Sequence, residues 1–146
     1  MKQLLLFAAI ACLTQYSCRR TSSADQMARS LNGDWRMIIV KDITSGSATI
    51  KPSFIQGDVD ITFNSSNSQG GTFMGHTPTN DIQQSHFFTG IHQTLSIPEL
   101  SMTKVAETSW GTEFVDNIRS ARGYVFESDG RLTIKTSGKT LTFLKL

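Results

Sequence analysis

The sequence predicts a mainly β fold, a small antiparallel barrel or strongly curled sheet of about seven strands, with one amphipathic helix near residues 108-120. Apolar and polar residues alternate with a period of two in several short runs, which is typical of strands with one buried face. Turn residues separate these runs at short intervals, as in small all-β barrels. In the segment near residues 108-120, the apolar residues instead recur with the period of an α-helix.

The first part of the domain is predicted to contain two strands joined by a long loop. Residues 35–40 form the first strand, and a loop rich in Ser and Gly covers 45–57. Residues 58–63 alternate strictly between apolar side chains and side chains with carboxylate or hydroxyl groups. Because one face of this strand is polar, we interpret Asp58 and Asp60 as solvated residues rather than as a catalytic pair.

Three further strands are expected before the helix. Residues 64–71 have the composition of a turn, and a loop is expected at 76–84. Pro98 ends the last of these strands, because proline cannot donate a hydrogen bond to a neighbouring strand. The three strands are expected at 71–75, 86–88 and 93–97.

The helix follows from the spacing of its apolar residues. Trp110, Phe114 and Ile118 lie four residues apart, so they share one face of a helix. A hydroxyl residue, Thr108 or Ser109, provides the N-terminal cap, and the helix is expected to end near residue 120.

The last third predicts a meander of three antiparallel strands at 124–128, 131–135 and 140–144. Asp129-Gly130 is expected to form a two-residue type I′ turn, because this dipeptide readily adopts positive φ values. Ser137-Gly138 makes the second turn of the meander.

The N-terminus predicts export with lipid attachment. Lys2 and the apolar run at 4–13 provide the basic and apolar regions of a signal peptide. The run is shorter than the roughly 20 apolar residues that span a bilayer. Cys18 is the expected lipidated residue. The alternatives are lipidation of Cys12 or ordinary secretion with cleavage after Ala11.

These features divide the chain into a lipoprotein signal peptide at 1-18, a flexible tether at 19-30 and one domain at 31-146. The formal net charge of the chain is only +2, which excludes the basic surface of a typical nucleic-acid-binding domain. No cysteine follows Cys18, so a disulfide within the domain, a thiol nucleophile and a cysteine-ligated zinc ion are excluded. The expected partners are the membrane, through the N-terminal lipid, and an unknown envelope protein or small apolar ligand.

Few residues have the pattern of a catalytic or metal site. His76, His86 and His92 fall within a short stretch, but we interpret them as surface or strand-end residues rather than as metal ligands. Glu99, Glu107 and Glu113 flank the helix or lie on it, and we interpret them as solvated capping charges rather than as paired catalytic carboxylates. We therefore expect no enzymatic activity, no catalytic residue, no bound metal and no cofactor.

The predicted binding loop contains His76, Thr77 and Asn80, because loops on a rigid scaffold commonly carry function. On this hypothesis, Asn80→Ala leaves the fold intact and alters the binding of a partner or ligand. If Asn80→Ala instead unfolds the domain, Asn80 is a turn former.

Several short motifs occur in an order that matches a known family. The opening Leu31-Asn32-Gly33-Asp34-Trp35 has the L-x-G-x-W pattern of many small exported β domains. The further motifs, in chain order, are Ile61-Thr62-Phe63, Asn80, Thr103, the helix at 110–118, and the closing segments 132–134 and 141–143. Together they resemble the META domain of HslJ-like bacterial lipoproteins. Pro78-Thr79-Asn80 stands where family members often carry Gly-Cys-Asn, so no redox role is carried over.

The resemblance implies a compact barrel with lipocalin-like topology, an envelope location and no established enzymatic activity. We expect a non-enzymatic lipoprotein that is exported, lipid-anchored in the bacterial cell envelope and periplasm-facing, with a role in interactions or stress maintenance. The alternative is a lipocalin-like carrier of a small apolar ligand, because barrels of about eight strands are wide enough to hold one.

Overall fold

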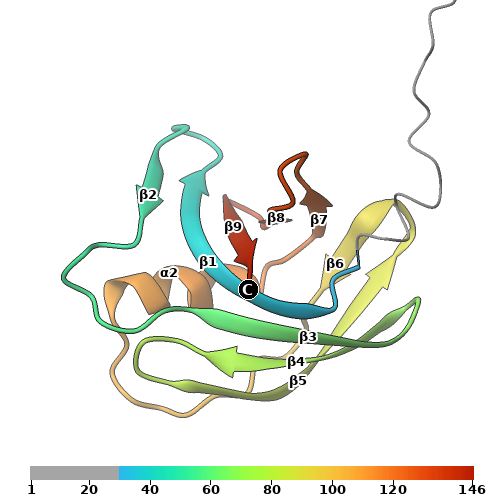
Figure 1. Cartoon of the computed structure of the whole chain (residues 1–146), viewed down its shortest axis with the longest axis horizontal. Helices are drawn as coiled ribbons and strands as arrows, with labels where there is room; N and C mark the ends of the chain where they lie inside the picture. The colour runs from blue at the N-terminus through green and yellow to red at the C-terminus, as the bar shows by residue number, and fades with distance from the viewer. Residues whose placement is uncertain (1–29) are drawn as a thin grey trace, which may run out of the picture.

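The computed structural model describes residues 30–146 as a closed antiparallel barrel of eight strands, with one extra strand and a single α-helix (Figure 1). The mainly β prediction is confirmed. The predicted signal peptide at 1-18, with Cys18, and nearly all of the tether lie outside the described residues. The barrel strands are β1 (Gly33–Asp42), β3 (Asp60–Asn67), β4 (Gly70–His76), β5 (Asp81–Gly90), β6 (Thr94–Ser96), β7 (Gly123–Phe126), β8 (Leu132–Lys135) and β9 (Lys139–Lys145).

The barrel closes because its first and last strands pair. β1 and β9 are antiparallel, and their register runs from Trp35 opposite Lys145 to Asp42 opposite Lys139. A bulge after Met37 shifts this register, which adds the local bend that a closed sheet requires. Every other pair of neighbouring barrel strands is also antiparallel.

Three of the predicted loop and turn boundaries are wrong. Ala48–Ile50 form β2 along the end of β1, within the loop predicted at 45–57. All three residues of β2 are exposed, so no buried face identifies this short strand within a segment rich in Ser and Gly. β3 continues to Asn67 through a predicted turn, and β5 begins at Asp81 within a predicted loop. In each case pairing with a neighbouring strand, rather than local composition, extends the strand.

Inward-facing side chains form one apolar core inside the barrel. Val59, Ile61 and Phe63 are at most 1 % exposed, which confirms that these alternating residues share the buried face. The rings of Phe63 and Phe87 meet edge to face, with 5.0 Å between their centroids. Aromatic pairs of this geometry stabilise a core beyond the burial of their area.

The helix α2 (Ser109–Ile118) confirms the predicted amphipathic helix. Thr108 caps it, because its Oγ1 accepts a hydrogen bond of 3.1 Å from the Gly111 N–H. Phe114 is fully buried and packs edge to face against Phe143, an inward-facing residue of β9. The helix therefore closes over the barrel core. No helix within residues 30–146 is long and apolar enough to cross a membrane.

The turn between β7 and β8 differs from the predicted type I′ turn. Gly130 N–H donates to the Glu127 C=O at 3.1 Å, and Glu127 N–H donates to the Arg131 C=O at 2.8 Å. Gly130 has a φ of +87°, but Asp129 does not adopt positive φ. The loop is thus the three-residue type with a glycine bulge. The Asp129 carboxylate instead accepts a hydrogen bond of 2.7 Å from Arg131 Nε.

Candidate functional site

The turn between β4 and β5 carries two of the three predicted binding residues. Thr77 N–H donates to the Asn80 C=O at 2.8 Å, and Asn80 N–H donates to Thr77 Oγ1 at 3.0 Å. These two bonds close a tight hairpin with Pro78 and Thr79 at its tip, positions where proline and hydroxyl residues favour a turn. Thr77 and Asn80 are each only 3 % exposed, so the hairpin holds both side chains inside the protein.

The side chain of Asn80 joins this hairpin to the segment that leads into α2. Its Nδ2 donates to the Val105 C=O and to Glu107 Oε2, both at 2.9 Å. Its Oδ1 accepts from the Val105 N–H at 2.7 Å and from Thr103 Oγ1 at 3.1 Å. The whole amide group is therefore used within the protein. We place Asn80 as the residue that holds this segment next to the start of β5.

Glu107 is the second centre of the same network. Its Oε1 accepts from Thr79 Oγ1 at 2.8 Å and from the Thr108 N–H at 2.9 Å, and its Oε2 accepts from Thr77 Oγ1. Burial disfavours the carboxylate charge, but these donors and Asn80 outweigh it and hold the pKa of Glu107 below its ordinary value. Glu107 is therefore a hydrogen-bonded member of this network rather than a solvated charge, because both of its carboxylate oxygens accept from protein donors.

Gly111 leaves the space that this carboxylate occupies. A Cβ atom at Gly111 would lie 2.2 Å from Glu107 Oε1, far inside van der Waals contact. Glycine in the first turn of α2 therefore permits Glu107 to reach the hairpin. The start of the helix thus packs against the β4–β5 hairpin because Gly111 leaves space for the Glu107 carboxylate between them.

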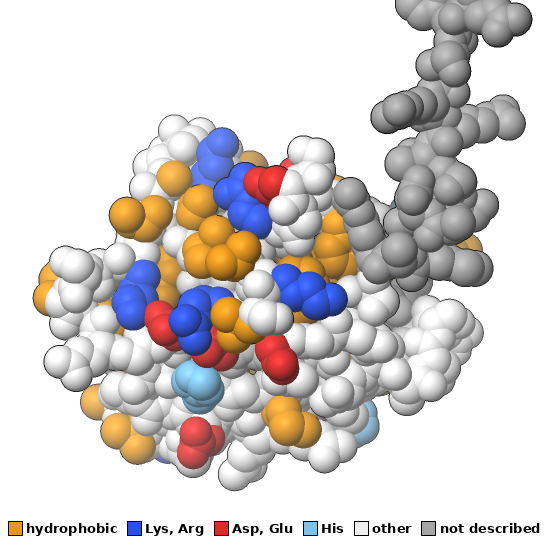
Figure 2. Space-filling view, viewed as in Figure 1, with side chains coloured by type: hydrophobic (Ala, Val, Ile, Leu, Met, Phe, Trp, Pro, Cys, Tyr) orange, Lys and Arg blue, Asp and Glu red, His pale blue; other side chains and the backbone are white. Residues whose placement is uncertain are grey.

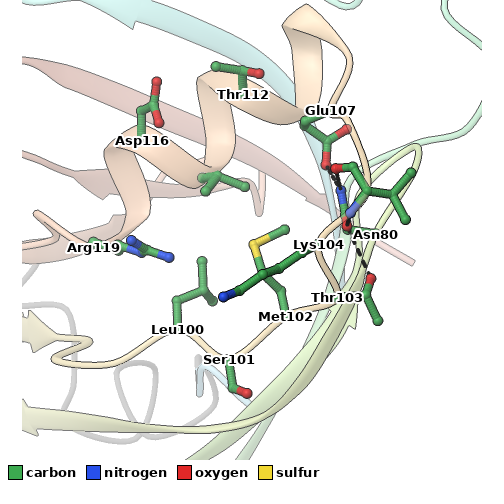
Figure 3. A pocket seen from close by; sticks show the side chains of 12 residues that line it. Asn80, Leu100, Ser101, Met102, Thr103, Lys104, Glu107, Thr112, Asp116 and Arg119 are labelled. Carbon is green, nitrogen blue, oxygen red and sulfur yellow. Dashed lines mark hydrogen bonds between the residues drawn. The ribbon is translucent and has the colours of Figure 1, made fainter.

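A surface groove of about 470 Å³ lies beside this network, between α2 and the segment that leads into it (Figure 3). Its apolar lining includes Leu100, Met102 and Val115. Asn80 and Glu107 form one end of the groove, so the hydrogen-bonded network supports its shape (Figure 3). The volume falls in the range of small-molecule and peptide pockets, roughly 300–1,000 Å³.

Two cationic side chains enter the groove from opposite sides. Lys104 belongs to the segment before α2, and Arg119 follows the last turn of the helix. Their charged ends face each other on either side of Leu100 (Figure 3). Within residues 30–146, neither charged group forms an ion pair or a hydrogen bond. The middle of the groove is therefore a site where two positive charges have no counter-ion from the protein.

His76, the third predicted binding residue, lies on a different part of the surface. Its Nε2 is 3.7 Å from Asp60 Oδ2, and half of its side chain is exposed. Asp60 accepts two hydrogen bonds from Arg36, at 2.7 and 2.8 Å, and Arg36 also lies 3.2 Å from Asp58. Arg36 lies on β1, Asp60 on β3 and His76 at the end of β4, and Asp58 lies just before β3. Figure 2 shows basic, acidic and histidine side chains gathered on one face of the molecule. Asp58 and Asp60 are therefore ion-paired, not free solvated carboxylates.

The other two histidines do not join His76. His86 lies on the exposed face of β5, and His92 lies in the short 3-10 turn η1 (Ile91–Gln93). Over residues 30–146, no three histidine, cysteine or carboxylate side chains lie together in a way that could hold a metal ion.

The sequence alone does not indicate that Glu107, Lys104 and Arg119 line the same groove as Asn80. More than twenty residues separate Asn80 from each of them, so no local spacing connects them. One local sign was present, a glutamate directly before the capping Thr108, with a glycine in the first turn of the helix. Such a carboxylate sits where it can accept hydrogen bonds from the helix start and from a neighbouring loop.

Comparison with known proteins supports the fold alone. No family model matches this chain, and no curated protein matches it. An NMR structure of a protein from Burkholderia xenovorans is similar to it, with a TM-score of 0.58 and 20 % sequence identity. The match covers 86 % of this chain and 88 % of that chain, so the similarity extends over the whole barrel rather than over a fragment.

Proposed function

We propose that this chain is a non-enzymatic, lipid-anchored envelope protein whose META-like barrel binds a partner at the groove beside α2. In this proposal, residues 1-18 direct export and Cys18 carries the lipid. The domain faces the periplasm and takes part in interactions or stress maintenance there.

The observation that carries the proposal is the pair of unpartnered cations, Lys104 and Arg119, in a groove of mixed polar and apolar lining. The fold does not depend on either charge, because α2 is held by buried Phe114 and by the hydrogen bonds around Glu107. A concave site that combines apolar side chains with converging polar and charged groups has features of a binding site.

The geometry favours binding at the groove over two alternatives, an enzyme and a lipocalin-like carrier. Glu107 is the carboxylate at the inner end of the groove, and its oxygens are occupied by donors that keep it charged, so it is poorly placed to exchange a proton with a substrate. For a lipocalin-like carrier, an interior cavity is required, whereas the inward-facing side chains of this barrel pack into one core. We therefore propose no catalytic residue and no cofactor.

Site-specific photo-crosslinking in cells tests the proposal. The photoreactive amino acid p-benzoylphenylalanine replaces Thr112, an exposed groove residue, in the full-length chain. The same replacement at Asp129, in the exposed β7–β8 loop, is the control. We expect a discrete adduct in the envelope fraction from the groove position alone. The absence of an adduct from Thr112, or equal adducts from both positions, contradicts binding at the groove.

A further inference from the structure

The segment before α2 pairs with β5 as a short strand would. Ser101 C=O accepts from the Gln83 N–H at 2.9 Å, and Thr103 N–H donates to the Asp81 C=O at 3.0 Å. These bonds flank Met102, which forms an isolated antiparallel bridge with β5. In such a pair, the residue between the two bonded positions turns its own N–H and C=O away from the partner strand. The backbone polar groups of Met102 therefore face away from β5.

The free backbone edge at Met102 borders the groove. Met102 lines the groove, and α2 forms the opposite wall (Figure 3). In the described part of the chain, no group hydrogen-bonds to the N–H or C=O of Met102. A strand edge with a free donor and a free acceptor is the surface to which an extended peptide adds. The helix α2 bounds the space on the other side of this edge.

The charges around the groove favour an acidic peptide. Lys104 and Arg119 face each other without a counter-ion, so a carboxylate placed between them would gain two charge-assisted contacts. The neighbouring carboxylates do not fill this role. Glu107 is bound by the hairpin, and Asp116 points away from Lys104 (Figure 3). Glu99 lines an adjoining hollow together with Arg119, but within residues 30–146 the two form no ion pair.

We propose that the groove binds an extended peptide, which adds as a strand along Met102 and places a carboxylate between Lys104 and Arg119. This inference rests on the proposed function and names the chemistry of the partner, an acidic polypeptide segment in extended conformation. Apolar side chains two residues before and two residues after the carboxylate would share its face of the added strand and pack toward Leu100 and Val115.

The probe is the peptide acetyl-Val-Thr-Glu-Thr-Val-amide, titrated into the full-length protein in detergent micelles and followed by amide NMR. We expect binding to slow hydrogen exchange of the Met102 amide at least tenfold, because a free N–H becomes hydrogen-bonded. A second peptide, with Gln in place of Glu, should bind about fivefold more weakly because it lacks the charge.

Backbone recognition is tested at Met102 itself. Met102→Pro removes an N–H that the fold does not use, and Met102→Ala keeps that N–H while removing the same side chain. We expect the proline variant to bind the Glu peptide about fivefold more weakly than the alanine variant, at equal thermal stability. Equal affinity of the two variants overturns strand addition.

Recognition of the peptide carboxylate is tested at Arg119, an exposed residue whose substitution leaves the fold intact. Arg119→Gln should weaken binding of the Glu peptide about fivefold and leave binding of the Gln peptide unchanged. Arg122→Gln is the matched control, since Arg122 is exposed, lies three residues further along and does not line the groove. If both variants bind the two peptides alike, the carboxylate does not lie at Arg119 and the proposal is overturned.

The outcome also separates this inference from the proposed function. If neither peptide binds at up to about 1 mM, while decanoate shifts the groove amides, the ligand is a small anionic amphiphile and the peptide proposal is overturned. The proposed function then still stands, provided that the Thr112 crosslink forms. If the Thr112 crosslink is absent and neither peptide nor decanoate shifts the groove amides, both proposals are wrong.

Discussion

Asn80 Nδ2 donates a hydrogen bond of 2.9 Å to Glu107 Oε2, across 27 positions of the chain. This bond joins the β4–β5 hairpin to the start of α2, and both residues also border the groove. Asn80 and Glu107 therefore do two things at once: they hold the hairpin against the helix, and they line one end of the groove.

Asn80→Ala should destabilise the domain by about 2–4 kcal/mol, because it leaves the backbone N–H and C=O of Val105 without their partners. Denaturation in urea measures the change. Asn64→Ala, at an exposed asparagine on β3, is the control and should shift stability by less than about 0.5 kcal/mol. Equal stability of the two variants would instead favour the hypothesis that Asn80 serves binding alone.

Glu107 should make the domain less stable in acid. Its folded pKa lies below the ordinary glutamate value of 4.5, so its contribution is fully present above that pH and is lost as the pH falls through the folded pKa. Urea denaturation between about pH 7 and pH 3 measures the slope. Glu107→Gln should show a shallower loss of stability in acid than the native chain. Parallel pH profiles for the two proteins contradict this role.

Gly111→Ala should destabilise the domain by about 1–3 kcal/mol, although alanine normally favours a helix over glycine. The reason is the predicted 2.2 Å contact between the new Cβ and Glu107 Oε1. A double-mutant cycle by thermal denaturation tests this cause. In a Glu107→Ala background, Gly111→Ala should become neutral or stabilising. An unchanged penalty in that background would mean that the carboxylate is not responsible.

Phe63→Ala should cost about 3–5 kcal/mol, because Phe63 is fully buried between other rings of the barrel core. Phe54 is 81 % exposed, so Phe54→Ala is the matched control and should change the free energy of unfolding little. A small effect at Phe63 would indicate a loosely packed interior, which the carrier alternative requires.

Cys18→Ala should release the full-length protein from the membrane fraction and abolish the lipid adduct seen by intact mass. This expectation rests on the sequence, since Cys18 lies outside the described residues. A single acyl chain binds membranes only marginally, so stable anchoring of the native chain requires a second acyl chain on the cysteine or a basic segment beside it. If the native protein is soluble and begins at Cys12, ordinary secretion is correct and the lipid anchor is excluded.

Local physical chemistry made the elements of this fold predictable. The alternation of Val59, Ile61 and Phe63 marks one buried strand face, and the four-residue spacing in 110–118 marks the helix. The threonine cap of α2 is likewise a short-range signal. Each feature depends on residues at most a few positions apart, so the sequence by itself determined the mainly β class and the place of the helix.

Tertiary structure alone decided how those elements close and where a site forms. The pairing of β1 with β9 joins opposite ends of the domain, and β2 exists only because the end of β1 offers it an edge. Asn80 appeared to be a loop residue, whereas folding buries it against Glu107 and Val105. These contacts are set by long-range strand pairing and by the packing of α2, and no local period in the chain encodes either of them.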